Sequence, residues 1–153
     1  MRARKGRHTI LLAADQTRFP KATRYLKTVL PSVADNAAIA SAMLRTAQLN
    51  RAAFRAALTW GASPEIRVVP GLAACGSFTP TPGNNTIEIR ESIFVDFEAG
   101  RGQLRTRAGR VAALGLNVLH EMVHWGDNLD GVDRPGEEGD EFEGLVYGRN
   151  LGC

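Results

Sequence analysis

The feature that most constrains this chain is a long apolar segment that contains two histidines. From about Ala108 to Trp125, apolar side chains recur with helix spacing and predict one long helix with a wide apolar face. His120 and His124 stand four positions apart within this segment. Residues at that spacing lie one above the other on a single face of a helix, so the two imidazoles are expected to point the same way.

The run His120-Glu121-Met122-Val123-His124 has the pattern H-E-x-x-H. Two imidazoles on one helix face can meet a single zinc ion at about 2.0–2.1 Å. The intervening glutamate reaches a water molecule rather than the metal, and zinc can lower the pKa of such a water to around 7. The pattern therefore predicts a zinc hydrolase in which Glu121 is the general base. A chance match is the alternative, but the apolar Met122 and Val123 suit the other face of the helix.

The third metal ligand is less obvious from the sequence. Zinc hydrolases commonly use three protein ligands and leave one position open. Glu143 follows His124 at a spacing similar to that of thermolysin-like gluzincins, and we expect it to be this ligand. The alternatives are Glu141, Glu138 and Asp130. His8 is the only other histidine, and it stands near the N-terminus.

Two further residues are candidates for roles close to the metal. Tyr147 stands four positions after Glu143, on the same face of a predicted helix. Its phenol is a candidate to stabilise the oxyanion, although a buried aromatic residue would give the same pattern. Asp127 either accepts a hydrogen bond from a ligand imidazole or lies in a solvated turn.

The order of predicted elements indicates an α+β fold. The segment from about Pro20 to Trp60 reads as helices, and residues 65–69 and 86–90 read as short strands. The long helix follows, and a last helix is predicted from Asp140 to Tyr147. We expect N-terminal helices, a small antiparallel sheet, the long H-E-x-x-H helix and a C-terminal helix, in a zincin-like arrangement. The chain length is typical of a single domain, so we expect one zinc metallopeptidase domain over residues 1–153.

Several local signals refine these boundaries. Pro31 is expected to end the first helix, and Asp35 and Asn50 to cap the second and third. Residues 92–97 continue as strand or turn into helix, and residues 100–107 read as a basic, glycine-containing loop.

Composition limits the other classes of function. The net charge is +3, with a basic first half and an acidic C-terminal part, but no nucleic-acid-binding motif accompanies the basic residues. We therefore expect a solvated helical face and no nucleic-acid partner. No apolar run approaches the roughly 20 residues that span a bilayer, and the N-terminus lacks a signal-peptide pattern. Cys75 and Cys153 form either one disulfide or two free thiols, and we expect free thiols.

The residues around the H-E-x-x-H pattern resemble a known family, the metallopeptidase toxin 3 group of bacterial polymorphic toxins. The similarity covers roughly Thr86 to Gly148 and does not extend to the segment before about Trp60. The residues that carry it are Asn117 to Asp127, Asp130-Gly131, Glu138-Gly139, Phe142-Glu143, Tyr147-Gly148, Asn85 to Ile89 and Phe94 to Gly100.

The resemblance implies an antibacterial zinc peptidase that hydrolyses a protein or peptide substrate. It implies zinc on His120, His124 and Glu143, with Glu121 as the base. Members of this group occur with spike proteins of the type VI secretion system, and each is neutralised in its producer by a cognate immunity protein. Export by that machinery is consistent with the missing signal peptide, and it places the activity in the periplasm of a target bacterium. Peptidoglycan peptides are an alternative substrate, and a zinc-containing binding module without activity is an alternative function.

Overall fold

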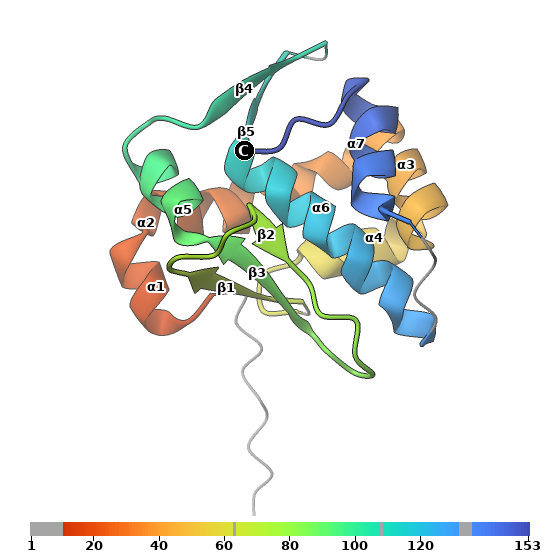
Figure 1. The fold of residues 1–153 in the computed structure, drawn as a ribbon, viewed down its shortest axis with the longest axis horizontal. Helices are drawn as coiled ribbons and strands as arrows, with labels where there is room; N and C mark the ends of the chain where they lie inside the picture. Colours follow the sequence, from red (N-terminus) through yellow and green to blue (C-terminus); the bar gives the residue numbers. More distant parts are fainter. Residues whose placement is uncertain (1–10, 63, 108, 132–135) are drawn as a thin grey trace, which may run out of the picture.

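The computed structural model describes residues 11–62, 64–107, 109–131 and 136–153 of the chain. Helices form the N-terminal part, and strands alternate with helices in the rest, so the predicted α+β class is confirmed (Figure 1). The N-terminal helical elements are α1 (Ala13–Arg18), α2 (Pro20–Arg24), the π-helix η1 (Tyr25–Val29), the 3-10 helix η2 (Leu30–Asp35), α3 (Ala37–Ala47) and α4 (Arg51–Leu58). The later elements are β1 (Glu65–Val69), β2 (Gly76–Ser77), β3 (Thr86–Arg90), α5 (Glu91–Glu98), β4 (Gln103–Thr106), β5 (Gly109–Ala112), α6 (Ala113–Asp127), η3 (Asn128–Asp130) and α7 (Glu138–Tyr147).

Helix α6 runs through the middle of the fold (Figure 1). It packs against α3 and α7 on one side and against β2 and β3 on the other. Gly126 permits the close contact with the segment that ends α3, because a methyl group there would lie 2.9 Å from the side chain of Leu49. The long apolar helix predicted from the sequence is therefore the centre of the core, but it begins at Ala113, after the short strand β5.

The three-stranded sheet has the order β1-β3-β2, so β3 is its central strand. Strand β1 pairs with β3 in parallel, and β2 pairs with β3 antiparallel. The prediction of an antiparallel sheet is thus wrong for this pair. Two strands become parallel when a long connection returns the chain to the same end of the sheet, and residues 70–85 provide that connection. Strands β4 and β5 form a separate antiparallel hairpin. Strand β4 lies where the sequence predicts a loop, and β5 lies where it predicts the start of the long helix, so both predictions are wrong at these residues.

The helix caps follow the sequence with one shift. Asn36, and not Asp35, caps α3 by accepting a hydrogen bond from the N–H of Ile39 at 3.1 Å. The prediction for Asp35 is wrong because η2 continues through it and leaves Asn36 as the first extended residue. Asn50 caps α4 as predicted, with a hydrogen bond of 2.8 Å. Pro31 does not end the helical segment, because it stands in the first turn of η2, where its missing N–H is tolerated.

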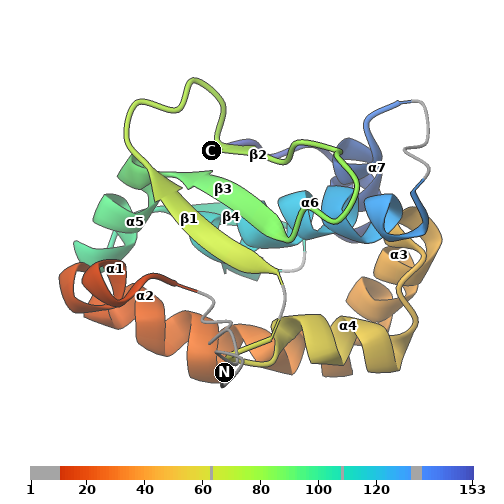
Figure 2. The same ribbon diagram turned by 90° about the horizontal axis from the view of Figure 1, so that it is seen from below.

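The C-terminal segment is fastened beside β2 by a disulfide between Cys75 and Cys153 (Figure 2). The two Cα atoms lie 5.8 Å apart, within the usual range for such a bond. The expectation of two free thiols is therefore wrong. The partners are 78 residues apart in the chain, and the return of the C-terminus to the sheet depends on tertiary packing that local sequence patterns do not reveal.

Candidate metal centre

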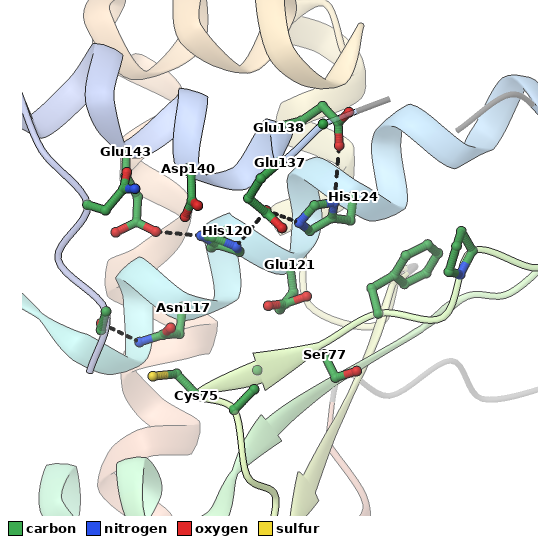
Figure 3. Close-up of a pocket in the computed structure, with 17 residues that line it drawn as sticks. Cys75, Ser77, Asn117, His120, Glu121, His124, Glu137, Glu138, Asp140 and Glu143 are labelled. Carbon is green, nitrogen blue, oxygen red and sulfur yellow. Dashed lines mark hydrogen bonds and ion pairs between the residues drawn. The ribbon is translucent and has the colours of Figure 1, made fainter. Parts of the chain in front are cut away.

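The two histidines face a cavity of about 540 Å³ bounded by α6, β2 and the start of α7 (Figure 3). All residues of α6 belong to the part of the chain that the structure describes, and all of them are buried except His120 and His124. Their side chains are 15% and 19% exposed. A helix that is apolar on nearly all faces must be buried, so the two imidazoles mark the place where it opens to the cavity.

Glu121 also lines this cavity, although its side chain is almost fully buried. Burial raises its pKa to about 7, while the electrostatic influence of the neighbouring His120 and His124 acts in the opposite direction. Strand β2 approaches this carboxylate closely at Gly76. A methyl group there would lie 2.7 Å from Cγ and 2.8 Å from Oε1 of Glu121, so only glycine leaves the carboxylate in its position.

A carboxylate from the start of α7 meets both imidazoles at their Nε2 atoms. Oε1 of Glu137 lies 2.6 Å from Nε2 of His124 and 3.2 Å from Nε2 of His120 (Figure 3). The side chain of Glu137 is half-exposed, at 50%. These three residues form one of two groups among the described residues that are close enough to hold a metal ion.

Two other carboxylates contact the opposite ring nitrogens. Oε2 of Glu143 lies 2.5 Å from Nδ1 of His120, and its Oε1 accepts a hydrogen bond of 2.9 Å from the N–H of Leu151. Oε2 of Glu138 lies 3.4 Å from Nδ1 of His124. Burial lowers the pKa of His120, but the hydrogen bond to Glu143 and the surrounding carboxylate charges outweigh it, so the pKa is raised.

The second group that could hold a metal ion consists of His120, Asp140 and Glu143. It includes the predicted ligand Glu143, but His124 is not part of it. Because the H-E-x-x-H pattern places both imidazoles on one helix face, a site that uses only one of them leaves the pattern unexplained. The group with Glu137 uses both.

The structure does not bring the remaining candidates into the cavity. Glu141 and Asp130 are exposed, and neither lines it. Tyr147 is buried and lines a different cavity together with Tyr25, where burial and the charge of Glu143 raise its pKa to about 12. Asp127 is buried at the end of α6, and the carboxylates on the two Nδ1 atoms come from α7 instead. His8 lies outside the described residues.

Sequence reasoning assigned no role in the site to Glu137, Gly76 or Gly139. A methyl group on Gly139 would overlap the imidazole of His120 around Nε2, so the start of α7 lies directly against the Nε2 end of the ring. Helix periodicity could not identify Glu137, because it precedes the first turn of α7. The adjacent acids Glu137 and Glu138 followed by a glycine are the one local signal, since acidic residues favour the start of a helix.

Comparison with known proteins bears on this geometry. The model of the family described as metallopeptidase toxin 3 matches residues 15–148. The match extends the sequence resemblance through the N-terminal helices to α1. No curated protein and no solved structure matches the chain.

Proposed function

The chain belongs to the metallopeptidase toxin 3 family, and from this premise we propose that it is a zinc-dependent endopeptidase that acts as an antibacterial toxin. The observation that carries the proposal is the convergence of His120 and His124 on one cavity that Glu121 also lines. A structural metal site has no use for a buried carboxylate in that position, whereas hydrolysis needs a base.

The residues around the cavity fit a zinc ion. The donors are two imidazoles and a carboxylate, which suit zinc, and each imidazole has a carboxylate on its second nitrogen. Glu138 adds a specific observation, because its buried carboxylate receives no hydrogen bond from any described residue. A buried negative charge without donors is costly, and a cation held by the adjacent His124 would offset that cost.

The proposed chemistry assigns each step to a residue of this chain. When bound, zinc supplies a Lewis acid that lowers the pKa of water and polarises a carbonyl group. Glu121 takes a proton from the water that attacks the peptide carbonyl, and it returns the proton to the amine of the leaving peptide. Gly76 leaves room for this carboxylate, since the side chain of any larger residue would press on it.

Substrate binding is proposed along β2. Strand β3 is the central strand of the sheet, between β1 and β2, so it is not an edge with which a substrate could pair. Strand β2 is at the edge, and Gly76, Ser77 and Phe78 line the cavity. An extended peptide that pairs with β2 would pass in front of Glu121.

Delivery is proposed to occur through the type VI secretion spike machinery into the periplasm of a target bacterium, with a cognate immunity protein in the producer. The disulfide between Cys75 and Cys153 supports an oxidising destination, because such bonds persist outside the reducing cytosol. No helix among the described residues is long and apolar enough to cross a membrane.

The test compares wild type with Glu121→Gln. Zinc content is measured first, and cleavage of an unfolded protein substrate and of purified peptidoglycan is then followed in parallel. We expect wild type to bind one zinc and cleave protein, and Glu121→Gln to keep zinc while its rate falls about 10²–10⁴-fold. Cleavage of peptidoglycan alone would favour the alternative substrate. Undiminished toxicity of Glu121→Gln in a target periplasm would exclude the peptidase and favour a non-catalytic binding module.

A further inference from the structure

The carboxylates around the two histidines divide by the ring nitrogen that they contact (Figure 3). Glu137 lies on the Nε2 side of both rings. Glu143 and Glu138 lie on the Nδ1 side, one on each ring. A neutral imidazole has one N–H and one lone pair, so a carboxylate that accepts the N–H leaves the lone pair on the other nitrogen. The hydrogen bond to Glu143 therefore directs the Nε2 lone pair of His120 toward Glu137. Oε2 of Glu138, 3.4 Å from Nδ1 of His124, favours the same orientation of the second ring through its charge, without a hydrogen bond.

Of the two distances between Glu137 and the imidazoles, one matches a shared metal ion and the other is shorter. In a tetrahedral site with bonds of about 2.0–2.1 Å, two ligand atoms are separated by roughly 3.3 Å. Oε1 of Glu137 lies 3.2 Å from Nε2 of His120 and 2.6 Å from Nε2 of His124. Glu137 is half-exposed and precedes α7, so small movements that widen the shorter distance meet little resistance.

The surroundings of Glu143 suit a different role. Its Oε2 contacts Nδ1 of His120, and its Oε1 accepts the N–H of Leu151, so both oxygens already have partners. Its side chain is 3% exposed, and Leu151 stands in the segment that the disulfide fastens to β2. A movement of Glu143 to the Nε2 side would leave the partly buried N–H of Leu151 without this acceptor, which is costly.

Gly139 shows how α7 brings Glu137 to this position. A methyl group at Gly139 would overlap the ring of His120, so the first turn of α7 rests on that ring. With α7 in this place, the buried side chain of Glu138 points to Nδ1 of His124. The half-exposed side chain of Glu137 lies beside the Nε2 atoms of both histidines (Figure 3).

We infer that Glu137 is the third protein ligand of the metal, and that Glu143 and Glu138 are positioning residues that hold the two imidazoles by their Nδ1 atoms. The inference rests on the proposed zinc site, and it differs from the sequence prediction, which assigns the third ligand to Glu143.

The decisive test places a thiol at each candidate position. Glu137→Cys and Glu143→Cys are loaded with Co²⁺, because a cobalt–thiolate bond produces an intense absorption band in the near ultraviolet. Both native cysteines are held in the disulfide, so the new residue is the only free thiol. We expect the band with Glu137→Cys and not with Glu143→Cys. A band with Glu143→Cys alone would overturn the inference.

Zinc affinity, measured by competition with a chromogenic chelator, gives the second readout. We expect Glu137→Gln to bind zinc more than about 100-fold more weakly, and Glu143→Gln to lose about 10–100-fold, as outer partners of ligand histidines do. At saturating Co²⁺ the visible spectrum should change in Glu137→Gln and stay as in wild type in Glu143→Gln. Glu141→Gln is the matched control, because Glu141 is an exposed acid of the same helix, and its affinity should equal that of wild type.

The outcomes separate this inference from the proposed function. Weaker zinc binding in Glu137→Gln supports the inference even if no peptide bond is ever cleaved. Wild-type affinity in Glu137→Gln, with zinc bound, overturns the inference and leaves the peptidase intact, and a wild type that binds no zinc overturns both. Circular dichroism checks the fold, and Glu137→Asp, which keeps the carboxylate, should recover part of the affinity.

Discussion

Helix α6 and the start of α7 build opposite sides of the same site in different ways. On α6, His120 and His124 are fixed by a helix whose other residues are all buried, so their placement follows from packing. On the α7 side, Glu137 stands before the helix and is half-exposed, while Glu143 depends on the C-terminal segment. The α6 side is held by the buried packing of its helix, and the α7 side is held by contacts between segments that are distant in sequence.

Removal of the disulfide should cause the largest loss of stability, and this loss should fall mainly on the α7 side of the site. For a closed loop of 78 residues, loop entropy predicts a loss of about 4.5 kcal/mol of stability in Cys75→Ser/Cys153→Ser, within the usual range of about 2–5 kcal/mol. Denaturant unfolding measures this loss. Hydrogen exchange should show faster opening at Leu151, which contacts Glu143, than in α6. Equal loss of protection in both regions would contradict the division drawn between them.

The site itself shows how far sequence reasoning reaches. The pattern at residues 120–124 identified two histidines and a base because one helix carries all three, and helix geometry is local. Asn50 was recognised as a cap for the same reason, since its contact lies within one turn. Glu137 and the disulfide were not predicted, because their positions depend on how α7 and the C-terminus return to α6 and β2.

The parallel pairing of β1 and β3 was missed for a related reason. Each strand was recognised from its own residues, but the direction of pairing depends on the path of residues 70–85 between them. The three-dimensional path of that connection is set by contacts with α6 and β3, which alternation of apolar residues does not encode.

Gly139 lies where the α6 and α7 sides of the site touch. Gly139→Ala places a methyl group against the Nε2 end of the His120 ring, so α7 and the imidazole have to separate. Overpacking of this kind costs about 1–3 kcal/mol, and we expect zinc affinity to fall up to about 100-fold. Gly144→Ala is the matched control in the same helix, because nothing lies within 4 Å of a methyl group there. Zinc titration of both variants tests this. An unchanged affinity in Gly139→Ala would mean that α7 does not rest on the ring.

Gly76→Ala tests the base without touching the metal ligands. The new methyl group would lie 2.7 Å from Cγ of Glu121 and displace a flexible side chain rather than backbone. We therefore expect about a tenfold fall in kcat, with zinc affinity and melting temperature close to those of wild type. Ser77→Ala is the control on the same strand and should retain activity within about twofold. If Gly76→Ala lost zinc as well, β2 would be supporting the histidines and not only Glu121.

Tyr147→Phe should have the smallest effect on activity, because the phenol lies in a cavity apart from Glu121. We expect kcat at pH 7 within about twofold of wild type, and a larger loss would return Tyr147 to the role of oxyanion stabiliser predicted from the sequence.

The effect of Tyr147→Phe on stability should appear only in alkali. Burial, then the charge of Glu143, raises the pKa of Tyr147 from 10.0 to about 12, so the folded state favours the protonated phenol. That contribution is complete below pH 10 and is lost as the pH rises toward 12. Tyr25 behaves in the same way and remains in the variant. Melting temperatures between pH 9 and 12 should thus fall in both proteins, but less steeply in Tyr147→Phe, and parallel curves would show that the buried phenol is not linked to folding.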